Sequence, residues 1–219
     1  MTRIAIIGAH GKVAQQLMRQ LYDRGDEFVG VVRDPEHADD VYRFGGDGVL
    51  LDIEHAAPEQ LAAVMTGCDA VVFSAGAGPG SGVVRKRTVD YEGSVKSAAA
   101  ALQAGVRRFI QVSAMGVDAA VPDDADPTWA AYVQAKRDAD LSLQQQDLDW
   151  TILRPGALTL EEGTGRVRLG ETVPRGSIPR ADVAALIVTA LGDPRTIGQI
   201  WEATSGETAI TEAVQALVG

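Results

Sequence analysis

Cysteine is almost absent from this sequence. Cys68 is the single example among 219 residues, so no disulfide can form within the chain. Histidine is also sparse, and His10, His37 and His55 are too widely spaced to form the paired ligands of a metal site. One cysteine fits a reducing compartment, and we expect the Cys68 thiol to pack inside the protein rather than to react. The sequence therefore predicts neither a disulfide-stabilised fold nor a bound metal.

A basic surface and a long apolar run are lacking as well. Acidic residues outnumber basic ones by 30 to 20, which gives a formal net charge of −10. Nucleic-acid binding needs the opposite balance, so we expect no nucleic-acid partner. No apolar run reaches the length of a membrane span, and the N-terminus has the pattern of a strand rather than a signal peptide. These features predict a cytoplasmic protein with no membrane partner and a small-molecule substrate.

Short apolar runs alternate with helical patterns along the whole chain. This order predicts an α/β fold with a doubly wound, mostly parallel sheet of the Rossmann type. Residues 1–219 are expected to form one domain, with 154–179 as a small substrate-side lobe. The predicted strands are Ile4–Ile7, Glu27–Val32, Gly48–Leu51, Ala70–Phe73, Phe109–Val112, Trp150–Leu153 and Gln199–Glu202, and the predicted helices are Lys12–Arg24, Pro58–Met65, Val83–Ala104, Thr128–Gln146, Arg180–Leu191 and Thr208–Val218.

The first predicted strand runs into a glycine-rich turn, Gly8-Ala-His-Gly11-Lys-Val-Ala14, and then into a helix. The N-terminus of a helix presents free N–H groups and the positive end of its dipole, and both attract phosphate. Gly8 can adopt the unusual dihedral angles of the turn, and Gly11 has no Cβ to block a phosphate. This G-x-x-G-x-x-A spacing predicts a dinucleotide site, although a turn without a ligand can have the same pattern.

The residues that follow each strand indicate the cofactor, because ligands of a parallel sheet bind beyond the carboxyl ends of its strands. Arg33 follows the second strand and can hold the 2′-phosphate of NADP, with help from His10 and Lys12. Asp34 would bind the ribose of NAD instead if it faced the cofactor. We therefore expect NADP in preference to NAD. The predicted cofactor-binding residues are Gly8, His10, Gly11, Lys12, Val13, Arg33, Asp52, Ser74, Ala75, Gly76, Lys136 and Pro155.

A second group of residues lies near the middle of the chain. Tyr132 and Lys136 are four residues apart on a predicted helix, which places both side chains on one face. A nearby ammonium favours the phenolate and makes the tyrosine a better acid or base near neutral pH. Ser113, at the end of the fifth strand, would orient or polarise a substrate oxygen. The spacing predicts a Ser–Tyr–Lys catalytic site. A tyrosine and a lysine that lie on a solvated helix face, without a catalytic role, would have the same spacing.

These motifs, with Ile152-Leu-Arg-Pro-Gly156 and Arg180-Ala-Asp-Val-Ala184, resemble the atypical branch of the short-chain dehydrogenase/reductase superfamily. The similarity is to its NAD-dependent epimerase/dehydratase-like, NmrA-like and biliverdin/flavin reductase-like groups. The resemblance implies a seven-stranded parallel sheet, bound NADP(H) and Tyr132 as catalytic acid or base. Asp90 stands where the family often has asparagine, and we include it in the predicted catalytic group. Its carboxylate would either stabilise the charge of Lys136 or occupy that charge and weaken its effect on Tyr132.

The resemblance implies an NADP(H)-dependent oxidoreductase or an epimerase/dehydratase-like enzyme with hydride transfer at the nicotinamide. A non-catalytic NADP(H)-binding redox sensor is the alternative, motivated by Asp90. The substrate is not identified by the sequence, although Arg154 and Arg180 flank the small lobe and would suit an anion. The basic run Arg85-Lys86-Arg87 is typical of a solvated helix start. The sequence does not decide whether the protein forms a homodimer, although long helices beside the sheet often pair subunits in this family.

Overall fold

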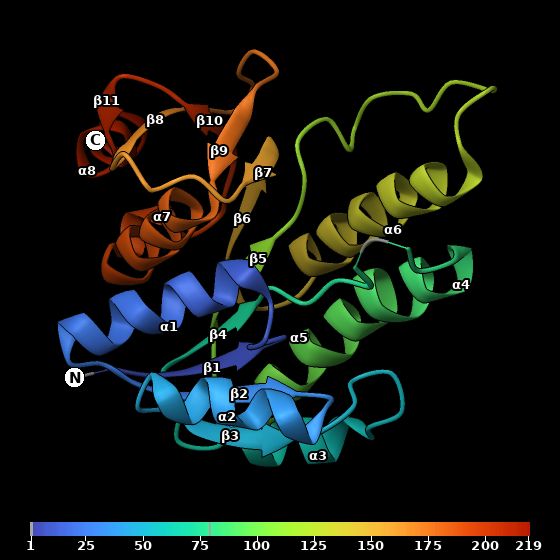
Figure 1. Ribbon diagram of the computed structural model, residues 1–219, viewed down its shortest axis with the longest axis vertical. Helices are drawn as coiled ribbons and strands as arrows, with labels where there is room; N and C mark the ends of the chain where they lie inside the picture. Colours follow the sequence, from blue (N-terminus) through green and yellow to red (C-terminus); the bar gives the residue numbers. More distant parts are fainter. Residues whose placement is uncertain (1, 79) are drawn as a thin grey trace.

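Seven parallel strands form the centre of the protein. Figure 1 shows the computed structural model, which describes residues 2–78 and 80–219. The parallel strands follow the order β10-β6-β5-β4-β1-β2-β3, so the direction of the order reverses beside β1. Ligands of doubly wound sheets bind at such a reversal. The strands are β1 (Arg3–Ile7), β2 (Glu27–Val32), β3 (Asp47–Leu50), β4 (Ala70–Phe73), β5 (Arg108–Val112), β6 (Asp149–Pro155) and β10 (Gln199–Ser205).

Two further strands extend this sheet, which therefore has nine strands rather than the predicted seven. β8 (Arg166–Gly170) pairs antiparallel with β10, and β11 (Thr208–Ala209) pairs antiparallel with β8. β7 (Ala157–Thr159) and β9 (Ser177–Pro179) form a separate parallel pair. The segment 154–179 thus contributes β7, β8 and β9 beside the last parallel strand. The predicted α/β Rossmann fold is confirmed, and the additions lie at one edge.

Helices cover both faces of the sheet (Figure 1). On one face α1 packs against α7, and α7 packs against α8; on the other face α3 packs against α5, and α5 against α6. The helices are α1 (Lys12–Arg24), α2 (Pro35–Arg43), α3 (Pro58–Met65), α4 (Val83–Arg85), α5 (Gly93–Gln103), α6 (Pro127–Gln144), α7 (Arg180–Gly192) and α8 (Ile210–Val218), together with the π-helix η1 (Lys86–Glu92) and the 3₁₀ helix η2 (Pro194–Thr196).

The core consists of two apolar layers, one on each side of the sheet. Successive side chains of a strand point to opposite faces. Ile4 and Ile6 of β1 therefore join the layer beneath α1 and α7, while Ala5 and Ile7 join the layer beneath α3 and α5. All four residues are buried. This double burial explains why the central strands are apolar throughout instead of alternating with polar residues.

Two helical segments differ from the prediction. The predicted helix Val83–Ala104 is divided into α4, η1 and α5, and η1 has the wider π-helical turn. π-Helical segments are rare and often occur at functional sites. The helix α2 was not predicted, because its nine residues are mostly polar and only Val41 is buried.

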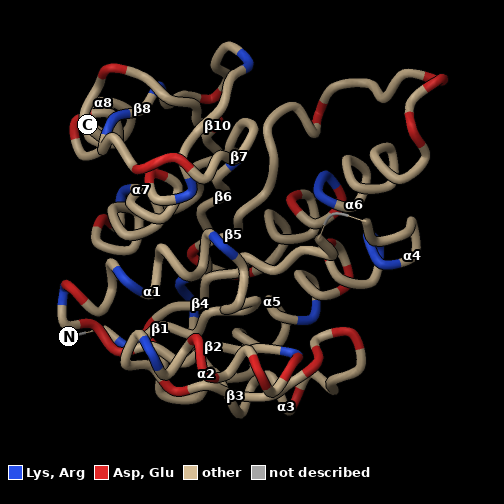
Figure 2. The backbone as a smooth tube through the Cα atoms, viewed as in Figure 1, with Lys and Arg blue, Asp and Glu red and all other residues tan. Residues whose placement is uncertain are grey.

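Charged residues of both signs are distributed over the chain, and Figure 2 shows Lys and Arg interspersed among Asp and Glu. Within residues 2–78 and 80–219, none of the helices combines the length and the apolar character that crossing a bilayer requires.

Candidate functional site

The glycine loop joins β1 to α1 at the point where the strand order reverses. Gly8 has a φ of 86°, and a Cβ on this residue would lie 2.6 Å from the Cα of Ala75, which follows β4. Any side chain at Gly8 would thus prevent the close approach of the loop to β4. Gly11 is the N-cap of α1 and has no side chain that could bond the first-turn N–H groups. These groups are arranged as a phosphate site requires, so the loop fits a dinucleotide.

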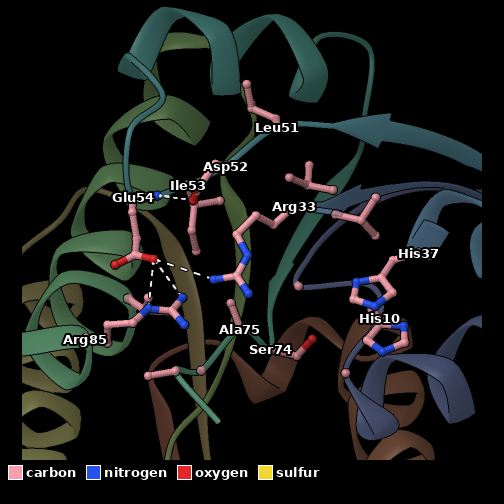
Figure 3. Close-up of a pocket in the computed structure, with 17 residues that line it drawn as sticks. His10, Arg33, His37, Leu51, Asp52, Ile53, Glu54, Ser74, Ala75 and Arg85 are labelled. Carbon is pink, nitrogen blue, oxygen red and sulfur yellow. Dashed lines mark hydrogen bonds and ion pairs between the residues drawn. The ribbon is translucent and has the colours of Figure 1, made fainter. Parts of the chain in front are cut away.

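A cavity of about 230 Å³, which we call the first cavity, lies beside the glycine loop (Figure 3). Its walls come from the loop and from the residues that end or follow β2, β3 and β4. Apolar side chains such as Val31, Ile53 and Val89 line part of it, and polar side chains line the rest. This combination suits the adenosine half of a dinucleotide. The predicted cofactor residues that line the first cavity are Gly8, His10, Gly11, Arg33, Asp52, Ser74, Ala75 and Gly76.

Arg33 directly follows β2 and lines the first cavity (Figure 3), and its side chain is 55% exposed. Its Nη1 lies 3.8 Å from Oε2 of Glu54, which is a long and weak ion pair. Arg85 donates to the same oxygen from Nε at 3.0 Å and from Nη2 at 2.7 Å, and Thr88 donates to Oε1 at 2.6 Å. Burial alone would raise the pKa of Glu54, but these bonds outweigh it and lower that pKa. Glu54 is therefore satisfied mainly by Arg85, which leaves the Arg33 guanidinium able to bind another anion.

His10 has a partner that the sequence did not indicate. Its imidazole ring stacks on that of His37, with the ring centroids 3.3 Å apart, and its Nδ1 lies 2.7 Å from Oδ2 of Asp40 (Figure 3 shows the two rings). His37 and Asp40 belong to α2, the helix that was not predicted. Both histidines line the first cavity.

Three polar residues near the first cavity have other partners. Asp34 caps α2 by accepting the N–H of Glu36 at 3.0 Å, so its carboxylate serves the helix rather than the cavity. Asp52 accepts the N–H of Glu54 and contacts Nδ1 of His55, both at 3.0 Å. Burial alone would raise the pKa of Asp52, but these two contacts lower it. Lys12 lines a separate cavity, contrary to the prediction that it joins Arg33 in one pocket.

A second cavity, of about 540 Å³, adjoins the first and shares Ser74, Ala75 and Gly76 with it. It brings together residues from α1, η1, β5 and α6. The alternative interpretation of Tyr132 and Lys136, as a pair on a solvated helix face, is wrong, because the Lys136 side chain is buried. The predicted catalytic and cofactor residues that line the second cavity, besides the three shared ones, are Val13, Asp90, Ser113, Tyr132 and Lys136.

Lys136 forms an ion pair with Asp90 inside the second cavity. Its Nζ lies 3.3 Å from Oδ1 of Asp90 and donates to the carbonyl of Val112 at 3.2 Å. The other oxygen of Asp90 accepts the N–H of Ala77 at 3.1 Å, which fixes the carboxylate. Burial would lower the pKa of Lys136, but Asp90 and then Tyr132 raise it overall. Asp90 is therefore paired with the Lys136 ammonium and stabilises its charge.

The pKa of the Tyr132 hydroxyl is higher than the sequence predicts. Burial raises its pKa, Lys136 lowers it, and Asp90 and Asp140 raise it again, so that the result lies above the ordinary value of 10.0. Lys136 acts in the expected direction, but the burial of Tyr132 and the two carboxylates outweigh it. The phenol is therefore protonated near neutral pH, and its raised pKa makes it a weaker acid than an exposed tyrosine.

A second lysine reaches the same tyrosine. Nζ of Lys86, in η1, lies 5.3 Å from the centroid of the Tyr132 ring and donates to the carbonyl of Gly78 at 2.9 Å. The prediction that the run 85–87 is a solvated helix start is thus wrong for Arg85, which lines the first cavity, and for Lys86, which is buried and lines the second. An ammonium over an aromatic face is a favourable contact.

Ser113 belongs to a buried polar network that the sequence did not reveal. Its Oγ donates to Oδ2 of Asp140 at 2.8 Å, and Asp140 also accepts from Gln111 at 2.7 Å and from Arg154 at 2.8 Å. Burial raises the pKa of Asp140 more than these three partners lower it. Arg154 also pairs with Asp118. It is therefore not free for a substrate anion, contrary to the prediction, and Ser113 offers only its lone pairs to the cavity.

The parallel sheet, its reversal point and the glycine loop define a protein of the Rossmann class, whose glycine loops are dinucleotide-binding sites. Residues 8–194 match the family described as NAD(P)H-binding, and the chain belongs to this family. It is an atypical short-chain dehydrogenase/reductase-like Rossmann protein, as its motifs predict, within an oxidoreductase and epimerase-like group.

Relatives and solved structures agree with this assignment. An uncharacterized sugar epimerase of Bacillus subtilis (strain 168), YhfK, is 36% identical over 216 residues, which is 98% of this chain and 100% of the relative. A candidate NAD-dependent epimerase/dehydratase from Bacillus halodurans is 35% identical with a TM-score of 0.90, covering 99% of this chain and 100% of that one. ChuY, an anaerobillin reductase from Escherichia coli O157:H7, is 25% identical with a TM-score of 0.77, covering 94% and 98%.

Proposed function

We propose that the protein is an NADP(H)-dependent oxidoreductase that interconverts a carbonyl compound and an alcohol. The observation that carries the proposal is the position of Tyr132 between two cavities. Tyr132 and Ser113 line the second cavity, which also holds Lys136, and they line a third cavity of about 580 Å³ that includes Pro155. A nicotinamide in the second cavity would give or take a hydride at its C4, and the third cavity would hold the substrate.

The preference for NADP rests on the partners of Arg33. Its ion pair with Glu54 is long, and Arg85 already satisfies that carboxylate, so the Arg33 guanidinium can turn to a 2′-phosphate at little cost. Asp34, the residue that would have favoured NAD, is engaged as the cap of α2. His10 and His37 line the same cavity and would add donors beside the phosphate.

Proton transfer is assigned to Tyr132. During reduction its hydroxyl would donate a proton to the substrate oxygen, which gains the alcohol hydrogen while the carbon gains the hydride. The hydroxyl is protonated near neutral pH, but its raised pKa makes it a weak acid, so proton donation depends on stabilisation of the phenolate that forms. Lys136, held as an ammonium by Asp90, would stabilise the phenolate left behind. Ser113 donates to Asp140, so it would accept a hydrogen bond from Tyr132 or from the alcohol.

Two other functions would use parts of the same site. A relative is named a sugar epimerase, and an epimerase would transfer the hydride out and back so that the cofactor returns unchanged. A redox sensor without catalysis is supported by the Asp90–Lys136 pair, which engages the lysine that would assist Tyr132. Such a sensor needs unequal affinities for NADP⁺ and NADPH, because a ligand shifts states only through differential binding.

The test is NADPH oxidation, followed by absorbance, with a panel of carbonyl compounds and quinones. Tyr132→Phe should lower kcat by about 100-fold or more, because a positioned acid contributes about that factor, and should leave NADPH affinity unchanged. Tyr22→Phe is the matched control, because Tyr22 is 62% exposed on α1 and lines none of the three cavities.

The outcomes separate the candidate functions. Turnover that survives Tyr132→Phe would contradict the assigned acid. Conversion of sugar isomers without net NADPH loss would replace the reductase with an epimerase. Absence of any turnover, together with unequal affinities for the two redox forms, would favour the sensor.

A further inference from the structure

The third cavity carries positive charge that the proposed proton transfer does not use. Arg175, in the loop between β8 and β9, and Arg180, the first residue of α7, both line it. The described residues that line this cavity include no Asp or Glu. Across residues 2–78 and 80–219, neither guanidinium pairs with a carboxylate, although the chain has 30 acidic and only 20 basic residues. Arg154 differs, since Asp140 and Asp118 both neutralise it.

Both arginines are held near the proposed proton donor. Arg180 donates from Nη1 to the carbonyl of Leu158 at 3.1 Å, and Leu158 lines the second and third cavities. Arg175 reaches across to the loop that follows β5, because a Cβ built on Gly116 would lie 3.5 Å from its Nη2. Both arginines thus line the cavity that Tyr132 also lines, and Arg180 lines in addition a neighbouring cavity that includes Glu161 and Glu162.

A buried carboxylate ties the loop of Arg175 to the loop that follows Ser113. Glu202, in β10, accepts the N–H of Gly116 at 3.0 Å with one oxygen and the N–H of Val173 at 3.1 Å with the other. Its side chain is buried, and its two bonds join the two loops to one another. The distance between the positive wall and the reacting end is therefore set by the fold rather than by two independent loops.

We propose that the third cavity binds a substrate that carries an anionic oxyacid group, a carboxylate or a phosphate, which Arg175 and Arg180 recognise. This inference rests on the proposed function, because Tyr132 would act on the carbonyl of the same molecule. Guanidinium groups match the oxygens of carboxylates and phosphates through paired hydrogen bonds. Trp129, 46% exposed, lines the same cavity and offers its ring to the carbon skeleton. The substrate class is thus oxo acids or phosphorylated carbonyl compounds and their alcohols.

The test is calorimetric titration of the protein saturated with NADP⁺, a state in which a carbonyl compound can bind but cannot be reduced. Two matched pairs serve as probes: benzoylformate with its methyl ester, and dihydroxyacetone phosphate with dihydroxyacetone. At least one anion should bind about tenfold or more tightly than its neutral partner, as charged hydrogen bonds allow. Which pair shows the difference distinguishes a carboxylate from a phosphate.

Variants locate the effect. Arg175→Gln and Arg180→Gln should each weaken binding of that anion by about tenfold or more. Arg168→Gln is the control, because Arg168 is an exposed arginine in β8 that does not line the third cavity, and it should change nothing. Equal binding of anion and neutral partner in the unmodified protein would overturn the proposal. A preference that persists when both arginines are replaced would also overturn it.

The same titrations separate this inference from the proposed function. If NADP⁺ binds and neither anion is preferred, the anion site fails while the cofactor site stands. If NADP⁺ does not bind, the proposed function fails, and titration of the cofactor-free protein with the same four probes then decides the anion site by itself. Anion binding that depends on Arg175 and Arg180, with no NADPH oxidation in the separate absorbance assay, supports the site and contradicts the oxidoreductase.

Discussion

Replacing Gly8 by alanine would separate the two reasons for a glycine in the loop between β1 and α1. The first reason is conformational, since Gly8 has a φ of 86°, a region that L-residues seldom adopt. The second is space, since the added Cβ would lie 2.6 Å from Cα and 2.8 Å from N of Ala75. Both of these are backbone atoms, so no flexible side chain can move aside and the loop must shift away from β4.

Gly25 provides a matched control for this substitution. It ends α1 with a φ of 75°, but a Cβ there would meet nothing within 4 Å. Gly25→Ala should therefore cost only the conformational part, about 1–2 kcal/mol of unfolding free energy. Gly8→Ala should cost a further 1–3 kcal/mol or so from overpacking, about 2–5 kcal/mol in total.

Urea unfolding of the two variants, followed by circular dichroism, measures the difference, and calorimetry measures NADPH binding. Gly8→Ala should be the less stable variant and should lose most of its NADPH affinity, because the shifted loop no longer presents its N–H groups to the phosphate. Gly25→Ala should bind NADPH as the unmodified protein does. Equal losses of stability in the two variants, or full NADPH affinity in Gly8→Ala, would show that the contact with Ala75 does not constrain the loop.

Two further predictions concern buried carboxylates. Asp90→Asn removes a charge that raises the pKa of Tyr132. The fall in the rate of carbonyl reduction at alkaline pH should therefore begin at a lower pH in this variant. Profiles of rate against pH measure this shift, and an unchanged profile would contradict it. Asp140→Asn removes a buried partner of Arg154 and should cost about 3–5 kcal/mol of unfolding free energy. Asp138→Asn, on the same helix but at a less buried position, should change stability by no more than about 0.5 kcal/mol in the same urea experiment, and equal effects would argue against the network.

Local patterns were enough to predict the parallel sheet and its glycine loop. The strand Ala70–Phe73 and the helix Lys12–Arg24 occur with the predicted bounds. A short uninterrupted apolar run indicates a buried strand, and an apolar period of 3.6 residues indicates a helix. The first-cavity residues follow from the same logic, since parallel strands deliver their carboxyl ends to one edge. The helix α2 lacked such a signal, with Val41 as its single buried residue.

Pairings between distant residues could not be predicted from the sequence. Asp140 lies 27 residues after Ser113, and only the fold brings the carboxylate to the hydroxyl. Arg85 meets Glu54 across 31 residues, which turns an apparent surface cation into part of the cavity wall. The pKa of Tyr132 depends on burial and on two carboxylates from other parts of the chain, so the spacing to Lys136 gave only one of its determinants.

The most direct test of the NADP(H) site is calorimetric titration of the cofactor-free protein with NADPH and then with NADH at one salt concentration. NADPH should bind about tenfold or more tightly than NADH, and Arg33→Ala should remove this preference. Arg43→Ala, which removes an exposed arginine of α2 outside the first cavity, should preserve it. Equal affinities, tighter binding of NADH or no binding of either dinucleotide would contradict the assignment of an NADP(H) site.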